Sequence, residues 1–297
     1  MRVPDLRSAL PALFALLLSM WIVVPGPTPL LFALSVGTIE LWPVVLLIAL
    51  GAATLIARRP KGRTRAISLA LAALAGAISL APLAAYVLRG PFVPVPVLLG
   101  ARGQTQNVAQ QTSSTGDIVY APVDAHALPI VIALYGGAWE RGSPQSDRSL
   151  NETLASWGYV VVAADYPHAP QARWPAQREA LLAELERVRT FAAAYGGDPH
   201  RIVLLGHSSG AQLALIAAAL RPHEIVAVVT YESPVDLYLG YLHPSRPDVI
   251  HIQAILQALC GAPPEMARAC YRSASPRYAV RAGMPPVLMF AAGRDHV

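Results

Sequence analysis

Hydrophobic and polar positions divide the chain into two parts with different patterns. In the first part, apolar residues form three long runs that contain almost no charge. Each run approaches the roughly 20 residues that a helix needs to cross a lipid bilayer. We therefore expect a membrane anchor over residues 1–89, with transmembrane helices at about 9–25, 37–57 and 66–88.

Basic residues are concentrated between the second and third apolar runs. They are Arg58, Arg59, Lys61, Arg63 and Arg65. By contrast, residues 25–40 contain no lysine or arginine. Positively charged loops stay on the cytoplasmic side of a membrane, so three crossings would place everything after Arg89 outside the cytoplasm. A cleaved signal peptide in place of the first helix would leave the same final orientation.

Residues 90–116 have the composition of a linker. Prolines stand near its start, and Gln, Ser and Thr dominate from Gln104 to Thr115. Segments of this kind bury too little apolar surface to fold alone and act as spacers. We therefore expect a stalk that joins the anchor to a folded domain at residues 117–297.

From Asp117 onward, short apolar runs typical of strands alternate with patterns typical of helices. The expected strands are 117–121, 130–134, 159–164, 202–205, 225–230 and 287–292, and the clearest helices are 175–195 and 209–220. This alternation predicts an α/β fold, with a mostly parallel sheet and helices on both faces.

Composition and charge agree with this division. The 297 residues are 54% hydrophobic and 14% charged, which is too apolar for one soluble domain and fits membrane segments in the first third. The formal net charge of +5 comes largely from the basic loop and the arginines near the amino terminus. Because no basic stripe interleaved with aromatics occurs in the folded domain, we expect no nucleic-acid partner.

One stretch carries the chemistry. The apolar run Ile202–Leu205 leads directly into Gly206-His-Ser-Ser-Gly210, and an alanine-rich helical pattern follows at once. A strand, a sharp turn and a helix in this order form a nucleophile elbow, in which a strained turn lifts the hydroxyl of Ser208 above the sheet. Glycine is required at 206 and 210, where a side chain would collide with neighbouring backbone. The N–H of Ser209 then points to where an oxyanion would form.

A second loop offers further hydrogen-bond donors. Gly136 and Gly137 directly follow the strand expected at 130–134. Consecutive glycines let backbone N–H groups approach a substrate oxygen closely. We expect them to complete the oxyanion hole with Ser209.

Six motifs in order carry a family resemblance that covers about residues 115–297. They are Tyr135-Gly-Gly-Ala-Trp139, Trp157-Gly-Tyr-Val-Val-Val-Ala-Ala-Asp-Tyr-Pro167, Trp174-Pro-Ala-Gln177, Tyr195-Gly-Gly-Asp-Pro-His-Arg-Ile202, Gly206-His-Ser-Ser-Gly210 and Pro285-Pro-Val-Leu-Met-Phe-Ala-Ala-Gly-Arg-Asp295. This domain resembles α/β-hydrolases of the carboxylesterase and acetylhydrolase branch, which includes hormone-sensitive-lipase-like and feruloyl-esterase-like enzymes.

The resemblance implies roles for individual residues. Ser208 matches the nucleophile, and Asp295 matches the acid of the catalytic triad. Asp165 matches a structural position. The family usually has histidine where this chain has Tyr135, which alters how the oxyanion loop is braced but leaves its backbone donors in place.

The triad histidine normally follows the acid after one more helix and strand, and only two residues follow Asp295 here. His207, inside the elbow, and His296, next to the acid, are poor substitutes. We expect a hydrolase truncated at its carboxyl terminus, with an incomplete sheet; a natural pseudoenzyme is the alternative. Without a base, a serine has little nucleophilicity at neutral pH.

Cys260 and Cys270 are the only two cysteines. Outside the cytoplasm they could form a disulfide that closes a short loop, and two free buried thiols are the alternative. Neither belongs to a C-x-x-C motif, so we expect no metal site.

These features together predict a membrane-anchored serine hydrolase that cleaves carboxylic esters through an acyl-enzyme intermediate, on a small-molecule ester substrate. Its catalytic domain would face away from the cytoplasm, with the lipid bilayer as the partner of its anchor. This chemistry needs no cofactor and no metal. Two alternatives remain: a catalytically inactive binding protein, and an amidase or peptidase with the same fold.

Overall fold

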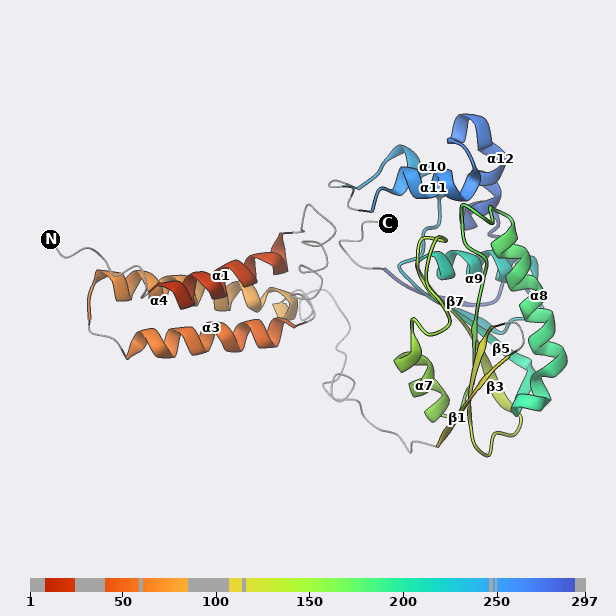
Figure 1. Ribbon diagram of the computed structural model, residues 1–297, viewed down its shortest axis with the longest axis horizontal. Coiled ribbons are helices and arrows are strands. Elements are labelled where there is room, and N and C mark those ends of the chain that lie inside the picture. Colours follow the sequence, from red (N-terminus) through yellow and green to blue (C-terminus); the bar gives the residue numbers. More distant parts are fainter. Residues whose placement is uncertain are drawn as a thin grey trace. The chain divides into compact units, whose positions relative to one another are not determined.

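The structure is a computed structural model that describes residues 9–24, 41–58, 61–84, 107–113, 116–245, 248 and 250–291. The chain separates into two compact units, Met1–Ala101 and Arg102–Val297 (Figure 1). Each unit is described by itself.

The described part of the first unit consists of three apolar helices. They are α1 (Leu10–Val23), α3 (Trp42–Ala57) and α4 (Arg63–Ser79). A helical stretch of 22 residues, Arg63–Ala84, is the one helix among the described residues that is long and apolar enough to cross a membrane. The other two have 14 and 16 residues, shorter than the spans expected from the sequence. The remaining ends of those spans lie outside the described residues, so three crossings stay a prediction.

The three helices pack mainly through small side chains. Ala15, Ala49 and Ala75 form one fully buried cluster, and Ala12 and Ala72 belong to a second together with Ile56. Large apolar side chains point outward instead; they include Phe14, Leu17, Leu47, Leu50, Leu55 and Leu74. A helical bundle of a water-soluble protein has the opposite arrangement.

The second unit contains a seven-stranded sheet in the order β1-β2-β4-β3-β5-β6-β7. The strands are β1 (Val108–Thr112), β2 (Ile118–Pro122), β3 (Leu128–Leu134), β4 (Val160–Ala164), β5 (Gly197–His207), β6 (Ala227–Tyr231) and β7 (Val287–Phe290). Only the β1–β2 and β2–β4 pairs are antiparallel. The predicted mostly parallel α/β sheet is confirmed.

One prediction is wrong at the start of this unit. The sequence pattern assigned residues 108–112 to a linker, but they form β1 and pair with β2 in register from Val108 with Pro122 to Thr112 with Ile118. The strand lies at the sheet edge, and its last three residues are exposed. Its polar composition, VAQQT, therefore reflects an edge strand.

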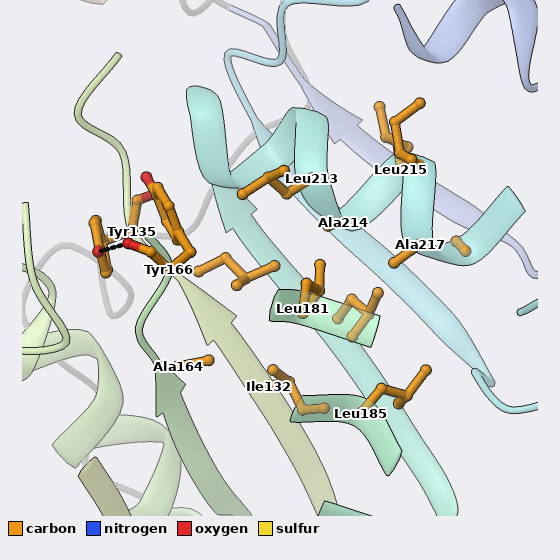
Figure 2. Close-up of a cluster of buried hydrophobic side chains, with 14 of the residues drawn as sticks. Ile132, Tyr135, Ala164, Tyr166, Leu181, Leu185, Leu213, Ala214, Leu215 and Ala217 are labelled. Atoms are coloured by element: carbon orange, nitrogen blue, oxygen red, sulfur yellow. Dashed lines mark hydrogen bonds between the residues drawn. The ribbon is translucent and has the colours of Figure 1, made fainter. Parts of the chain in front are cut away.

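Helices cover both faces of the sheet. The helices of this unit are α7 (Arg148–Ser156), α8 (Ala176–Phe191), η2 (Ala192–Tyr195), α9 (Ser209–Leu220), α10 (Leu237–Leu242), α11 (Ile252–Cys260), α12 (Pro264–Ala274) and η3 (Pro276–Tyr278). Helices α8 and α9 pack on one face, where Leu181, Leu213 and Ile132 belong to one buried cluster (Figure 2). Helix α7 packs on the other face, where Ala155 meets Val161. Alternate residues of each strand therefore serve two cores, as in other doubly covered sheets.

Helices α10, α11 and α12 fill the chain between β6 and β7, which the sequence pattern left without assigned elements. Cys260 and Cys270 are joined in a disulfide, with their Cα atoms 5.6 Å apart. Cys260 ends α11 and Cys270 lies in α12, so the bond ties these two helices together.

We expect the double variant Cys260→Ala/Cys270→Ala to lower the free energy of unfolding by about 2 to 3 kcal/mol, because opening the loop restores freedom to the unfolded chain. Denaturant unfolding of the detergent-solubilised chain measures this difference. Reduction of the wild-type protein should give the same loss and should leave the variant unchanged. An unfolding curve that neither change affects would contradict the prediction.

Candidate active site

The turn between β5 and α9 holds Ser208 in a strained conformation. Its φ of 51° and ψ of −118° are costly for a residue with a side chain, so the surrounding structure must impose them. The N–H of Ser208 donates to the carbonyl of Tyr231 at 2.9 Å, and its own carbonyl accepts from the N–H of Gln212 at 3.1 Å. The backbone on both sides of the serine is therefore fixed.

Two glycines allow this turn to form. A Cβ at Gly206 would lie 2.5 Å from the Cα of Ala211, inside the following helix. A Cβ at Gly210 would lie 2.2 Å from the carbonyl oxygen of Leu134, on the neighbouring strand β3. These contacts involve backbone that cannot move aside cheaply, which is the crowding that the elbow motif predicts.

The glycine loop that follows β3 lies against the elbow. A Cβ built on Gly136 would stand 3.2 Å from the Cβ of Ser208 and 3.1 Å from the carbonyl oxygen of His207. Trp139, at the end of the loop, is buried and donates from Nε1 to Oε1 of Gln212 at 3.0 Å. The structure thus brings the loop and the predicted nucleophile together.

The N–H of Gly137 has a partner inside the protein. It donates to Oγ of Ser209 at 3.0 Å. The hydroxyl of Tyr166 lies 3.2 Å from the same Oγ and donates to the carbonyl of Tyr135 at 2.9 Å. Ser209 therefore contacts the loop through its side chain, a contact that the sequence motif did not predict.

Ala138 is a candidate that sequence reasoning missed. Its φ of 56° is unusual for alanine, and its N–H has no hydrogen-bond partner among the residues that the structure describes. The neighbouring Trp139 also has a positive φ, of 59°. Backbone turns of this kind gather N–H groups around an anion. A backbone N–H donor leaves no mark on the type of side chain. The only signal in the sequence is that Ala138 follows two glycines.

Tyr135, which replaces the expected histidine, braces the loop from behind. Its hydroxyl donates to Oδ1 of Asp165 at 2.5 Å and lies 3.0 Å from Nε2 of His168. Its ring stacks on Tyr166 with centroids 4.4 Å apart. Burial, reinforced by the hydrogen bond to Asp165, raises the pKa of Tyr135 far above its usual value, so the phenol stays protonated and donates. Asp165 also accepts from the N–H of Tyr166, so it acts as a structural residue here.

His207 points toward the surface. Its side chain is about half exposed, and Nε2 lies 3.8 Å from Oε2 of Glu232, which follows β6. Within the described part of the chain, no hydrogen bond joins this imidazole to Ser208. Asp295 and His296 lie outside the described residues. The same part of the chain holds no cluster of three or more His, Cys, Asp or Glu side chains that could bind a metal ion.

The second unit corresponds to one known family. Residues 117–297, more than half of the chain, match the family BD-FAE. The chain belongs to the BD-FAE family. Individual relatives from Mycobacterium tuberculosis (strain ATCC 25618 / H37Rv) agree with this assignment. The putative acetyl-hydrolase LipR is 31% identical over 218 residues, which cover 67% of this chain and 66% of LipR. The probable carboxylic ester hydrolase LipM is 28% identical over 177 residues, which cover 56% of this chain and 41% of LipM.

Solved structures show the same fold. An esterase from Pyrobaculum calidifontis has a TM-score of 0.55 and 24% identity, covering 66% of this chain and 69% of its own. Esterase B from Lactobacillus rhamnosis has a TM-score of 0.55 and 20% identity, covering 70% and 72%. These likenesses establish the α/β-hydrolase fold of this member of the BD-FAE family. The chain spans less than half of the length of LipM and about two thirds of LipR.

We expect Gly210→Ala to destabilise the fold by about 1 to 3 kcal/mol, because the added carbon would overlap the carbonyl of Leu134. Gly240→Ala, in α10, is the matched control, since a Cβ at Gly240 meets nothing within 4 Å. Thermal unfolding of the two variants measures the difference. If both variants unfold at the wild-type temperature, the close approach of β3 to the elbow is not a constraint in the protein.

Proposed function

We propose that the protein hydrolyses carboxylic esters through an acyl-enzyme intermediate formed on Ser208. The hydroxyl attacks the ester carbonyl, the alcohol leaves, and water then releases the acid from the serine. The N–H groups of Ser209, Gly136 and Ala138 stabilise the oxyanion. The N–H of Gly137, which the sequence also predicted as a donor, bonds to Oγ of Ser209 instead. The observation that carries this proposal is the backbone of Gly136 lying against the Cβ of the strained Ser208.

The attack needs a base. We propose that Asp295 orients a histidine that takes the proton of Ser208. The exposed surface of β7 supports a continuation of the sheet, since Val287, Leu288, Met289 and Phe290 are each more than two fifths exposed. A further strand and helix would bury this apolar edge.

The names of the relatives support a substrate class. Their names include a carboxylic ester hydrolase, an acetyl-hydrolase and several esterases. We propose a small-molecule carboxylic ester as the substrate of this protein. No metal or cofactor enters the chemistry, because the nucleophile, its base and the oxyanion donors are protein groups.

We also propose that the three amino-terminal helices cross the membrane and hold the hydrolase unit outside the cytoplasm. Two observations support this. The helices pack through alanines such as Ala49 and Ala75 and expose leucines, which is how helices associate in lipid. The exposed hydroxyl of Thr54 bonds to the carbonyl of Leu50 in its own helix, so this polar group needs no partner from the bilayer. The basic loop between α3 and α4 would stay in the cytoplasm.

We expect Ser208→Ala in the full-length protein to lower kcat for p-nitrophenyl acetate by about 10³-fold or more, because no other group can form the acyl-enzyme. Release of p-nitrophenol measures the rate. Ser156→Ala is the control, since the Ser156 hydroxyl bonds to the Thr153 carbonyl in α7, on the other face of the sheet. Equal rates in wild type and Ser208→Ala would defeat the proposal, and no turnover by either would favour a binding protein.

We expect cysteines introduced at Lys61 and at Val123 to lie on opposite sides of the membrane. Both positions are exposed, one in the basic loop and one in the hydrolase unit. A membrane-impermeant maleimide added to intact spheroplasts should label the Val123→Cys variant and should label Lys61→Cys only after lysis. Labelling of both variants before lysis would exclude the proposed topology.

A further inference from the structure

Ser209 has a feature that the elbow does not require. The turn uses only its backbone N–H, which an alanine would supply equally well. Yet its side chain is a hydroxyl, and the residue is completely buried. Burying a hydroxyl costs free energy unless it is hydrogen-bonded. The partners of this hydroxyl therefore indicate what it contributes.

The directions of the hydrogen bonds can be assigned. A carbonyl can only accept, so Tyr166 uses its single proton in the 2.9 Å bond to the carbonyl of Tyr135. Burial raises the pKa of Tyr166 well above its usual value, which agrees with a protonated phenol. In the 3.2 Å contact Ser209 must then be the donor and Tyr166 the acceptor. Oγ of Ser209 in turn accepts from the N–H of Gly137 at 3.0 Å.

The bonds form a closed circuit. It runs from the N–H of Gly137 to Ser209, from Ser209 to Tyr166, and from Tyr166 back to the carbonyl of Tyr135. Its two ends lie on the same loop, two residues apart. Since each hydroxyl both accepts and donates, the bonds polarise and strengthen one another. The circuit therefore fixes the loop to the first residue of α9, directly beside the nucleophile.

We propose that the Ser209 hydroxyl is a positioning group, which sets the distance between the N–H groups of the Gly136–Ala138 loop and the oxygen of Ser208. The kinetic consequence of this inference rests on the proposed ester hydrolysis. The hydrogen bond from the Gly137 N–H to Ser209, called the tether below, does not depend on that function. Ser209→Ala would leave the Gly137 N–H without its acceptor, and the loop would relax away from the elbow.

The same contact has an opposite interpretation. Oγ of Ser209 could compete with a substrate oxyanion for the N–H of Gly137, and its removal would then speed the reaction. Gly137 argues against this, because a Cβ there would lie 1.9 Å from the carbonyl of Arg141, and its own carbonyl accepts from the N–H groups of Glu140 and Arg141. The turn from Gly137 to Arg141 thus fixes the Gly137 backbone so that its N–H points toward Ser209.

The test compares Ser209→Ala, Tyr166→Phe and the double variant in the full-length protein, with Ser156→Ala as the matched control. Amide hydrogen exchange at Gly137, followed by NMR or by fragmentation mass spectrometry, should accelerate in both single variants and stay unchanged in Ser156→Ala. Each single variant should lower kcat for p-nitrophenyl acetate roughly 5- to 10-fold with KM within about twofold, since only transition-state contacts are lost. The double variant should be no slower than the slower single variant, because both break one circuit.

The outcomes separate this inference from the proposed function. If the wild-type protein has no esterase activity, only the proposed function is contradicted. The amide exchange rate at Gly137 would still test whether Ser209 holds the loop. Unchanged exchange in Ser209→Ala would overturn the tether. So would a kcat equal to or above that of wild type in an active protein. If Ser209→Ala does not fold, Tyr166→Phe, which removes one oxygen from the same circuit, decides by the same two measurements.

Discussion

The close approach of strand β3 to the elbow is the constraint on which the site depends. The carbonyl of Leu134 occupies the space where any side chain at position 210 would have to lie. A Cβ at Gly136 would lie 3.2 Å from the Cβ of Ser208. Backbone packed at these distances cannot slide without breaking the parallel pairing of β3 with β5, which runs from Ile130 with Ile202 to Leu134 with Gly206. The nucleophile and the oxyanion loop therefore share one rigid frame, which is what preorganised stabilisation of a developing charge requires.

Hydrogen bonds and one ion pair connect the oxyanion loop to neighbouring parts of the hydrolase unit. Tyr135 reaches Asp165 after β4, and the N–H of Asp165 donates to Asp117 at 2.9 Å. Asp117 in turn pairs with Arg187 of α8 at 3.2 Å. On the other side, Trp139 bonds to Gln212, whose amide donates to the carbonyl of Ala274 at 2.6 Å. Tyrosine can thus replace histidine at 135, because the brace needs a buried donor that reaches the carboxylate of Asp165.

The sequence predicted those parts of the site whose signal is local. Gly206, Ser208 and Gly210 sit in one short motif because the turn needs all three within five residues. The parallel strands were predictable because both their faces are buried, which produces continuous apolar runs. Strand β1 was missed since an exposed edge strand tolerates polar residues. The role of the Ser209 hydroxyl was missed as well, because its partners stand at 137 and 166 and meet it only in the folded sheet.

The two units of the chain apply opposite packing rules, and this difference is itself evidence about their surroundings. In the hydrolase unit, large side chains such as Ile132 and Leu213 lie fully inside. In the helical unit alanines form most of the interior, with Val45 and Ile56 beside them, and leucines lie outside. In water an interior of alanines buries too little apolar area to offset the conformational entropy lost on folding, and the exposed leucines would favour aggregation. In lipid the outward leucines cost nothing, and small residues let helix backbones approach closely enough for dispersion contacts to hold them. The outward leucines, which would be a defect in a soluble domain, are therefore the surface that the proposed membrane anchor would present to lipid.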